Sequence, residues 1–277
     1  MKDMFAYDAV VQKMRQYFRE AKGFVEVPTQ SRQSILAACE DPATISQYIF
    51  GGTNWPLPQT GQMWLEYELL KNPTLNGVFC VTTSYRNEPN PVPGRHDKIF
   101  PMFEFELKGG IDELRKVEQE LLHFLGFRKT EGEYPWGDYE DVSKRYGVDE
   151  LEHEHEKQLE TDHGPVFFLE NFPKRTSPFW NMRLHEGGKH SNKIDVILHG
   201  METIGSAERS TNTQDMEHMF RTISNGDYAN TLYAQFSKER VENELNEFLQ
   251  KKFFERSGGG IGVTRMIRAM KLSNLLG

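Results

Sequence analysis

The sequence has little cysteine and no long apolar run, and both absences narrow the classes of protein it could be. Its 277 residues include only two cysteines, Cys39 and Cys80, which excludes a disulfide framework and a multi-cysteine zinc site. No apolar stretch reaches the roughly 20 residues that a membrane-spanning helix needs, and the first residues contain no apolar signal segment. We therefore expect a cytoplasmic protein with no membrane contact.

Positive charge is also in short supply. The chain has 33 Lys and Arg residues against 41 Asp and Glu residues, which gives a formal net charge of −8. A general nucleic-acid coat needs a basic surface, so this balance excludes that class but leaves room for a local basic site. Aromatic residues make up 12% of the chain, enough apolar mass to exclude a disordered protein. The length allows one large domain or two small ones.

The order of the expected helices and strands indicates an α+β fold built on an antiparallel sheet. Apolar residues at helical spacing predict helices, and runs of β-branched and aromatic residues predict strands. The expected helices cover 6–22, 61–71, 111–125 and 237–254, with a last helix after the glycine-rich segment. The expected strands cover 24–27, 77–85, 100–107, 165–170, 178–184 and 193–198, and 40–58 are expected to form a loop. Because strands and helices are segregated along the chain, hairpins are favoured over β-α-β units.

A hairpin that carries an arginine is the first candidate site. Arg86 and Glu88 follow one expected strand, and the chain returns through Phe100 after a loop that contains Arg95 and His96. Arg86, backed by Glu88, is a planar donor fork for an anionic oxygen. Arg95 and His96 could close over a polyphosphate, and Phe100 could offer a flat face to a base. An ordinary surface hairpin with ion pairs explains these residues about equally well.

Two further segments combine glycines with charged residues. The run Gly-Gly-Gly-Ile-Gly at 258–262 precedes Arg265 and is expected to form a turn that leads into a helix, where backbone can approach an anion closely. It matches neither a P-loop nor a dinucleotide-binding pattern, and a plain glycine-rich turn is the more frequent explanation. Asp195 and Glu202 are expected at neighbouring strand ends, where two carboxylates could hold Mg²⁺ unless they are solvated turn acids.

Taken together, these segments resemble the class II aminoacyl-tRNA synthetases of the aspartyl, asparaginyl and lysyl subclass. Residues 22–28 resemble the first motif of that class, 85–106 the second and 258–265 the third, in the right order over nearly the whole chain. The pattern Asp-x₄-Gly-x-Glu followed by Gly-x₃-Arg, at 195–209, resembles the aspartyl-type sequence between the last two motifs. The resemblance implies an antiparallel β-sheet flanked by helices and, through the first motif, a homodimer.

The resemblance also implies an ATP-dependent, AMP-forming ligase and gives roles to individual residues. Its catalytic residues would be Arg86 and Arg265. ATP would be bound by Arg86, Glu88, Arg95, His96, Phe100, Glu202 and Arg265, and Mg²⁺ by Asp195 and Glu202. Attack of a carboxylate on the α-phosphorus needs positioning and charge neutralisation rather than a covalent protein intermediate, which suits such a set.

Three residues would bind the amino acid, namely Gln62, Glu66 and Arg209. Arg209 matches the arginine that reads an aspartate carboxylate or an asparagine amide oxygen. Aspartyl enzymes carry a lysine where this chain has Leu65, and the following Glu66 resembles the asparaginyl pattern. Ile99 departs from the acidic residue usual before the position of Phe100. The expected substrate is therefore an amino acid like aspartate or asparagine.

The motifs occupy nearly all 277 positions, so we expect a single catalytic domain over 1–277 with no anticodon-binding domain. That expectation favours a tRNA-independent ligase of the asparagine-synthetase type, in which ammonia displaces AMP from an aspartyl-adenylate. A reduced asparaginyl- or aspartyl-tRNA synthetase that charges tRNA stays open. A regulatory or binding protein that keeps the fold without catalysis is the third hypothesis, and the intact set Arg86, Glu202 and Arg265 argues against it.

Overall fold

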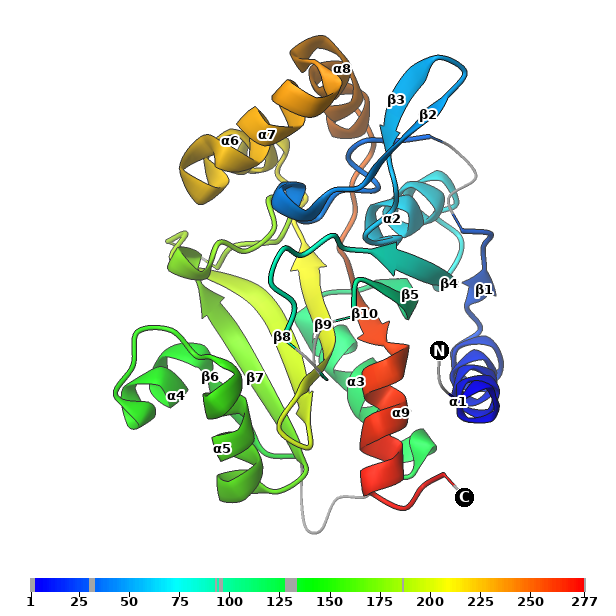
Figure 1. The fold of residues 1–277 in the computed structure, drawn as a ribbon, viewed down its shortest axis with the longest axis vertical. Helices are drawn as coiled ribbons and strands as arrows, with labels where there is room; N and C mark the ends of the chain where they lie inside the picture. The colour runs from blue at the N-terminus through cyan, green and yellow to red at the C-terminus, as the bar shows by residue number, and fades with distance from the viewer. Residues whose placement is uncertain are drawn as a thin grey trace.

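An eight-stranded sheet organises the chain (Figure 1), in the spatial order β1-β4-β5-β10-β9-β8-β7-β6. The computed structural model describes residues 3–29, 33–92, 94, 97–127, 134–185 and 187–276. The strands are β1 (Val25–Glu26), β4 (Gly77–Tyr85), β5 (Ile99–Lys108), β6 (Trp136–Asp138), β7 (Val166–Pro173), β8 (His190–Leu198), β9 (Glu202–Arg209) and β10 (Arg256–Gly262). The inner pairings are antiparallel, and only the edge pairings of β1 and β6 are parallel. The predicted fold class, α+β with an antiparallel sheet, is confirmed.

One face of the sheet carries the main apolar core. The helices α1 (Met4–Gln16), α3 (Ile111–Leu125) and α9 (Val263–Leu272) cover this face. A π-helical turn, Tyr17–Ala21, extends α1 to a stop before Gly23, whose φ of +67° glycine adopts without strain. The large apolar side chains of the core come from alternate positions of the central strands, as the pleat requires, and include Phe79, Phe103, Phe105, Ile194, Val196, Ile204 and Ile261. None of the described helices is long and apolar enough to cross a membrane.

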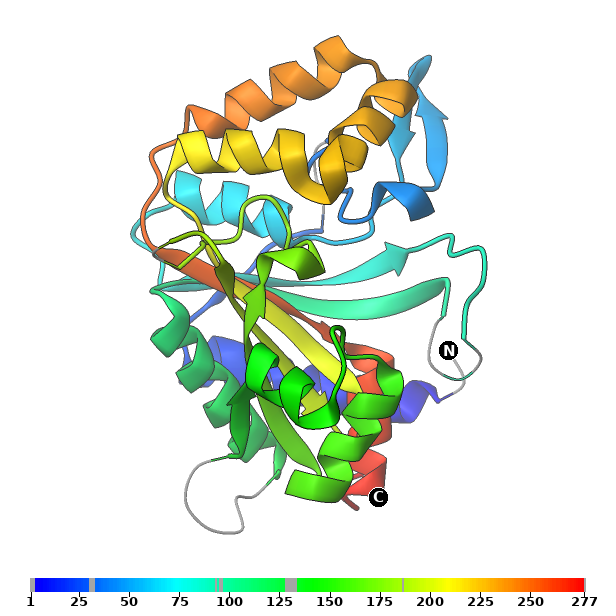
Figure 2. The ribbon, with the colours of Figure 1, turned by 90° about the vertical axis from the view of Figure 1, so that its left-hand side faces the viewer.

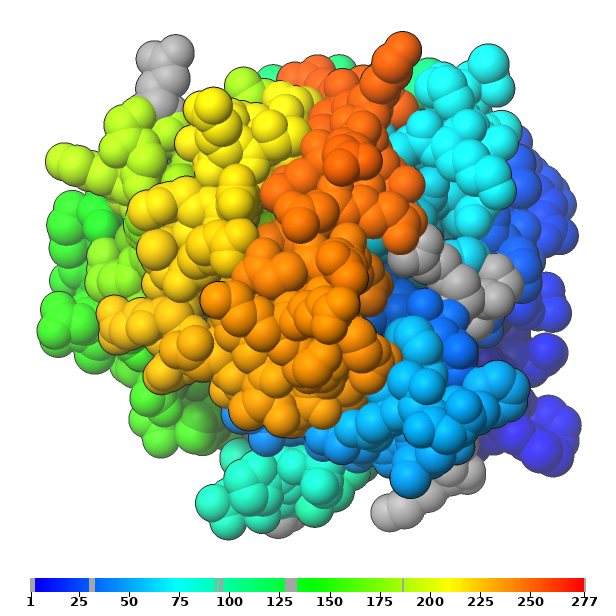
Figure 3. Space-filling view, turned by 90° about the horizontal axis from the view of Figure 1, so that it is seen from above, coloured from blue at the N-terminus to red at the C-terminus, as the bar shows by residue number. Residues whose placement is uncertain are grey.

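The opposite face carries α2 (Gln62–Lys71) over β4 and β5, while α4 (Tyr139–Tyr146) and α5 (His153–His163) pack near β7. A helical cluster of α6 (Thr213–Thr222), α7 (Asp227–Phe236) and α8 (Lys238–Leu249) lies beyond one end of the strands (Figures 1 and 2). Its own apolar core centres on Trp180, Phe220 and Phe248. Seen from above (Figure 3), this cluster lies beside the hairpin of β2 (Gln47–Phe50) and β3 (Thr53–Pro56).

Several segments differ from the sequence-based prediction. Residues 178–184 form no strand, only two isolated bridges, because the chain turns through Ser177 at φ +51° and then meets Pro178. The helix expected over 237–254 ends at Leu249, and α7 precedes it. The expected loop over 40–58 contains the β2–β3 hairpin, whose turn is made by two glycines with positive φ, as two-residue hairpin turns require.

The glycine-rich segment, which was expected to form a turn, is the central strand β10. It pairs with β5 on one side and β9 on the other. Side chains of those two neighbours leave no space for a β-carbon on β10. A Cβ at Gly258 would lie 1.9 Å from Oε2 of Glu106, and one at Gly259 would lie 2.5 Å from the Cβ of Ser206. The glycines therefore let charged side chains of neighbouring strands lie over the middle of the sheet.

Candidate functional site

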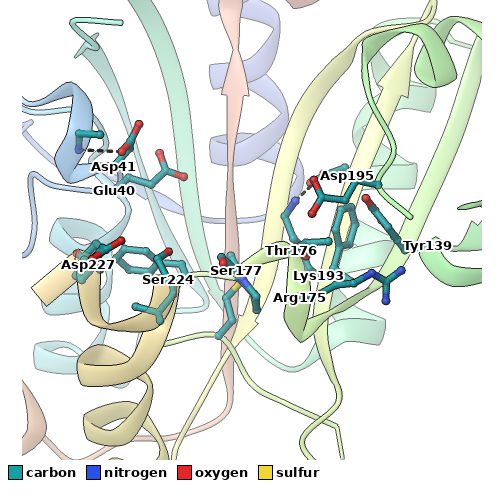
Figure 4. Close-up of a pocket in the computed structure, with 18 of the residues that line it drawn as sticks. Glu40, Asp41, Tyr139, Arg175, Thr176, Ser177, Lys193, Asp195, Ser224 and Asp227 are labelled. Atoms are coloured by element: carbon teal, nitrogen blue, oxygen red, sulfur yellow. Dashed lines mark hydrogen bonds and ion pairs between the residues drawn. The ribbon is translucent and has the colours of Figure 1, made fainter. Parts of the chain in front are cut away.

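A cavity of about 790 Å³ lies over the sheet, between two walls that carry opposed polar side chains. Figure 4 shows Glu40, Asp41 and Asp227 on one side and Lys193 and Asp195 on the other. The first wall comes from the loop before β2 and from α7, and the second from β7, β8 and β9 with the adjoining segments. Among the described lining residues, seven are acidic: Glu40, Asp41, Glu150, Glu156, Asp195, Glu202 and Asp227. Only Lys193 and Arg175 are cationic, so the cavity has a marked excess of negative charge.

Asp195 and Glu202 come together over Gly205, as the sequence predicted for neighbouring strands. A Cβ placed on Gly205 would lie 2.9 Å from Oε1 of Glu202 and 3.6 Å from Oδ1 of Asp195. Oδ2 of Asp195 accepts a hydrogen bond from Nζ of Lys193 at 2.6 Å, while the buried Oδ1 has no partner among the described residues. Burial raises the pKa of Asp195 to about 7, opposed by the ammonium of Lys193.

This carboxylate pair fits a divalent cation that prefers oxygen ligands. The orphaned oxygen of Asp195 is a free buried acceptor, which a cation would satisfy. The described residues contain no group of three or more His, Cys, Asp or Glu side chains that could hold a metal. A bound Mg²⁺ would thus take its remaining ligands from water and from phosphate oxygens, as Mg²⁺ in nucleotide sites usually does.

Arg86, just after β4, forms an ion pair with Glu40 of the first wall. Glu40 is the main cause that raises the pKa of Arg86, and Glu202 is a further one, so the guanidinium is firmly cationic and close to both walls. Its Cζ lies 6.0 Å from the centre of the Phe100 ring, at the limit of a cation–π contact. The backbone N–H of Glu40 donates to Oε1 of Gln59 at 2.8 Å, which fixes the loop.

Arg265 lies in the first turn of α9 and reaches the same carboxylate pair. Its Nη1 donates to the carbonyl oxygen of Glu202 at 2.8 Å and lies 3.7 Å from the carboxylate of that residue. The structure therefore brings Arg86, Asp195 and Arg265 near Glu202, although the four residues come from separate segments, and of the four only Asp195 and Glu202 line the cavity. Their roles toward a ligand stay predictions.

Two of the three residues expected to bind the amino acid, Glu66 and Arg209, lie in a buried cluster of four charges. Glu66 accepts from Nε and Nη2 of Arg256 at 3.0 and 2.6 Å. Arg209 donates from Nε and Nη2 to Glu106 at 3.2 and 3.3 Å, and its Nε lies 3.7 Å from Glu66. The cluster holds two arginines and two glutamates, so its formal charges cancel. Gln62 begins α2, and neither it nor the cluster is among the residues that line the cavity.

Buried Glu104 holds the start of α2 in place. Its Oε1 accepts from Oγ1 of Thr60 at 2.5 Å and its Oε2 from the backbone N–H of Gly61 at 2.8 Å. Burial raises the pKa of Glu104 to about 7, and these two hydrogen bonds oppose the rise. Because Gln62 follows directly, Glu104 fixes the position of the helix that carries it.

Some residues that the sequence predicted for the site lie away from the cavity, and some residues that line the cavity were not predicted. Glu88 and Phe100 are half-buried on the β4–β5 hairpin and do not line the cavity. Arg95 and His96 fall outside the described residues. Sequence reasoning did not single out Glu40 or Lys193, because a lone charged residue in a loop or a strand carries no pattern. Their importance follows from the cavity alone.

Comparisons with known proteins place this geometry in a family. The model of the family "tRNA synthetases class II (D, K and N)" matches residues 1–275. The aspartate–tRNA(Asp) ligase of Pyrobaculum aerophilum is 25% identical over 226 residues, which are 71% of this chain and 50% of that protein. The chain thus spans about half the length of the curated relative it matches.

Solved structures show the same fold. The asparaginyl-tRNA synthetase from Pyrococcus horikoshii complexed with asparaginyl-adenylate matches 96% of this chain and 64% of its own, with a TM-score of 0.77 and 19% identity. The aspartyl-tRNA synthetase from Entamoeba histolytica matches 96% of this chain and 54% of its own, with a TM-score of 0.70 and 17% identity. At these identities the likeness concerns the fold.

Proposed function

Because this chain belongs to the family of class II tRNA synthetases (D, K and N), we propose that it is an ATP-dependent ligase that activates an amino acid as an acyl-adenylate. The observation that carries the proposal is the convergence of Arg86, Asp195 and Arg265 on Glu202, at the edge of a cavity that Asp195 and Glu202 line. In this reaction a carboxylate oxygen of the amino acid attacks the α-phosphorus of ATP, the bond to the β-phosphate oxygen breaks, and pyrophosphate leaves. The protein needs to supply orientation and positive charge.

Individual residues have clear tasks in this proposal. Arg86 would bind both the attacking carboxylate and the α-phosphate, with Phe100 against the adenine and Arg265 on its other side. Asp195 and Glu202 would hold Mg²⁺, which neutralises charge on the triphosphate and pyrophosphate. Glu40 would exchange its ion pair with Arg86 for the ammonium of the substrate, so the two residues together would recognise an amino-acid zwitterion.

For the acceptor we propose ammonia, which makes the enzyme an aspartate–ammonia ligase of the asparagine-synthetase type. Seven carboxylates against two cations in the cavity favour an acceptor that arrives as a cation. Ammonium would first lose a proton, because only neutral ammonia has the lone pair that attacks. Ammonia would then attack the acyl carbon, the bond from that carbon to the phosphate oxygen would break to release AMP, and loss of a second proton would leave the amide. The second candidate is tRNA charging, which the similarity to an aspartate–tRNA(Asp) ligase favours.

The proposal includes a homodimer, as the first-motif resemblance implies. Near the N-terminus, Met4 and Phe5 on α1 and Val25 on β1 leave 67%, 78% and 43% of their surfaces exposed. Exposed large apolar side chains on one segment are typical of an association surface. A Phe5→Glu variant should sediment as a monomer while the unchanged protein sediments as a dimer, and a wild-type monomer would contradict this part of the proposal.

Exchange of radioactive pyrophosphate into ATP, measured with a panel of amino acids, tests the activation step. We expect exchange with aspartate or a close analogue. Arg86→Ala should lower it by at least about 100-fold, because one preorganised donor to the developing charge is lost. Arg145→Ala, an exposed arginine on α4, is the matched control and should keep full exchange. No exchange with any amino acid would refute the enzyme assignment.

AMP release then separates the acceptors. The enzyme is supplied with ATP, Mg²⁺ and the amino acid found in the exchange assay, and either ammonium or total tRNA is added. Turnover with ammonium alone supports the aspartate–ammonia ligase. Turnover that needs tRNA would reject ammonia as the acceptor and select the second candidate.

A further inference from the structure

Lys193 is the inner cation of the cavity, and the proposed function so far gives it no task. Its Nζ lies 2.6 Å from Oδ2 of Asp195 and 3.7 Å from the centre of the Phe172 ring, and its side chain is 22% exposed. Arg175, the other cation among the described lining residues, pairs with Glu140 and is 42% exposed. Lys193 is thus the more enclosed of the two, and it lies on the same wall of the cavity as Asp195 (Figure 4).

The strand register places Lys193 in line with the four-charge cluster. Across the sheet Lys193 faces Ala207, Ala207 faces Gly258, and Gly258 faces Glu106. The two middle positions carry a methyl group and no side chain, and Oε2 of Glu106 fills the space over Gly258, so the buried cluster occupies the far end of this row. Arg209 follows Ala207 by two positions on β9 and therefore lies on the same face of the sheet.

Arg209 closes the row from the other side. Its guanidinium donates to Glu106 and to the carbonyl oxygen of Gly258, so it lies over the far end of the row. Its charge is already matched by Glu106, and its side chain is only 3% exposed. The cavity reaches Lys193 and also Met182, whose backbone pairs with Arg209. An anionic group that enters from the cavity therefore meets Lys193 before it meets Arg209.

We propose that Lys193 determines substrate specificity by binding the carboxylate of the amino acid that is not activated. The substrate would then be a dicarboxylic amino acid such as aspartate. One carboxylate would lie at Arg86, the ammonium at Glu40, and the second carboxylate at Lys193, the cation that lines the cavity. This inference rests on the proposed function. It assigns the cation that distinguishes a dicarboxylic substrate from other amino acids to Lys193 on β8. An ammonium has three donors, so Lys193 can keep Asp195 while it binds the substrate.

Binding without ATP and metal tests the inference apart from catalysis. Titration calorimetry in a metal-free buffer compares L-aspartate with isoasparagine, its α-amide, which keeps the side-chain carboxylate that this ligase activates but carries a neutral amide in place of the other carboxylate. Lys193→Met should weaken aspartate binding by about 10- to 100-fold, since one charge-assisted hydrogen bond is lost, and change isoasparagine binding by less than about twofold. Lys193→Arg should keep most of the preference. Lys189→Met, an exposed lysine just before β8, is the matched control and should change neither ligand.

Steady-state measurements add a second readout. In pyrophosphate exchange Lys193→Met should raise KM for aspartate by a similar factor, while KM for ATP stays within about twofold of the wild type. Equal losses for aspartate and isoasparagine, or no loss for either, would overturn the assignment of Lys193. A wild type that binds aspartate through Lys193 but exchanges no pyrophosphate would uphold the inference and reject the proposed function.

Discussion

Gly258 faces Glu106 across β10 and β5 so closely that a β-carbon on the glycine would lie 1.9 Å from the carboxylate oxygen Oε2 and 2.4 Å from the carbonyl oxygen of Phe105. The contact is fixed by backbone on one side and by a buried carboxylate on the other. Because Glu106 also accepts from Arg209, the absent side chain is what allows a charged pair to lie over the centre of the sheet.

Gly258→Ala should therefore disturb the floor of the site more than its small size suggests. The added methyl group must displace Glu106 or the strand itself, so we expect a loss of at least about 2 kcal/mol in the free energy of unfolding. Urea denaturation measures it. Gly262→Ala is the control on the same strand, since its nearest atom is a side-chain carbon of Arg265 at 3.5 Å and its φ is −68°. Equal effects of the two variants would refute the steric argument.

Removing one partner of the Glu66–Arg256 pair should be costly, because both side chains are fully buried. Glu66→Leu would leave the guanidinium without its main acceptor, and we expect a loss of about 3–5 kcal/mol of stability. The double variant Glu66→Leu/Arg256→Met removes both charges and should recover much of that loss. Thermal or urea unfolding of the three proteins checks this. A double variant no more stable than the single one would show that the ion pair itself, rather than an uncompensated charge, carries the stability.

Glu118 on α3 should make the protein lose stability as the pH rises from about 4.5 to 8. Burial raises the pKa of Glu118 to about 8 from an ordinary value of 4.5, against a smaller opposing effect of Ser206. Between these two values the unfolded chain has lost the proton that the folded chain still holds, so the free energy of unfolding falls as pH rises. Glu118→Gln, which stays neutral, should lack this loss and gain about 3–5 kcal/mol over the wild type between pH 4.5 and 8.

Urea unfolding of both proteins across that pH range gives the comparison. The exposed Glu239→Gln on α8 is the control and should track the wild type at every pH. A constant offset between Glu118→Gln and the wild type would mean that Glu118 is already ionised in the folded protein.

Asp195→Asn should weaken metal binding in the presence of ATP. The substitution keeps the shape of the side chain but removes its charge, and we expect a loss of about 10- to 100-fold in affinity. Manganese, followed by electron paramagnetic resonance, is a direct probe that does not depend on turnover. Asp41→Asn, on the opposite wall, is the matched control and should bind the metal as the wild type does. Unchanged affinity in Asp195→Asn would remove Asp195 from the metal site.

The sequence predicted the parts of the fold that depend on local pattern. The helix over 111–125 appears with the same bounds, and the strand over 77–85 does so as well, because their apolar spacing is regular and they end at turn residues. The glycine run was misassigned for a non-local reason. The side chains of Glu106 and Ser206, on other strands, leave room only for glycine in this run. No pattern within the run itself reveals those neighbours.

The candidate site divides in the same way. Arg86, Asp195, Glu202 and Arg265 lie in recognisable motifs, and the structure brings them together. Arg256 gives no such signal, although it neutralises Glu66 from 190 positions away. A single charge in a sequence shows neither its partner nor its burial. Both depend on which strands become neighbours, and that is a property of the whole sheet.

The insertion of α6, α7 and α8 between two adjacent central strands also has a consequence for how the protein folds. Arg209 on β9 donates to the carbonyl oxygen of Gly258 on β10, which lies 49 positions further along the chain. Contacts of such long sequence separation form slowly, because the entropy of closing the loop must be met before the pairing stabilises it. The pairing of β9 with β10 therefore depends on the whole helical segment between them, and Arg209 reaches the carbonyl oxygen of Gly258 only when that segment returns β10 to the sheet.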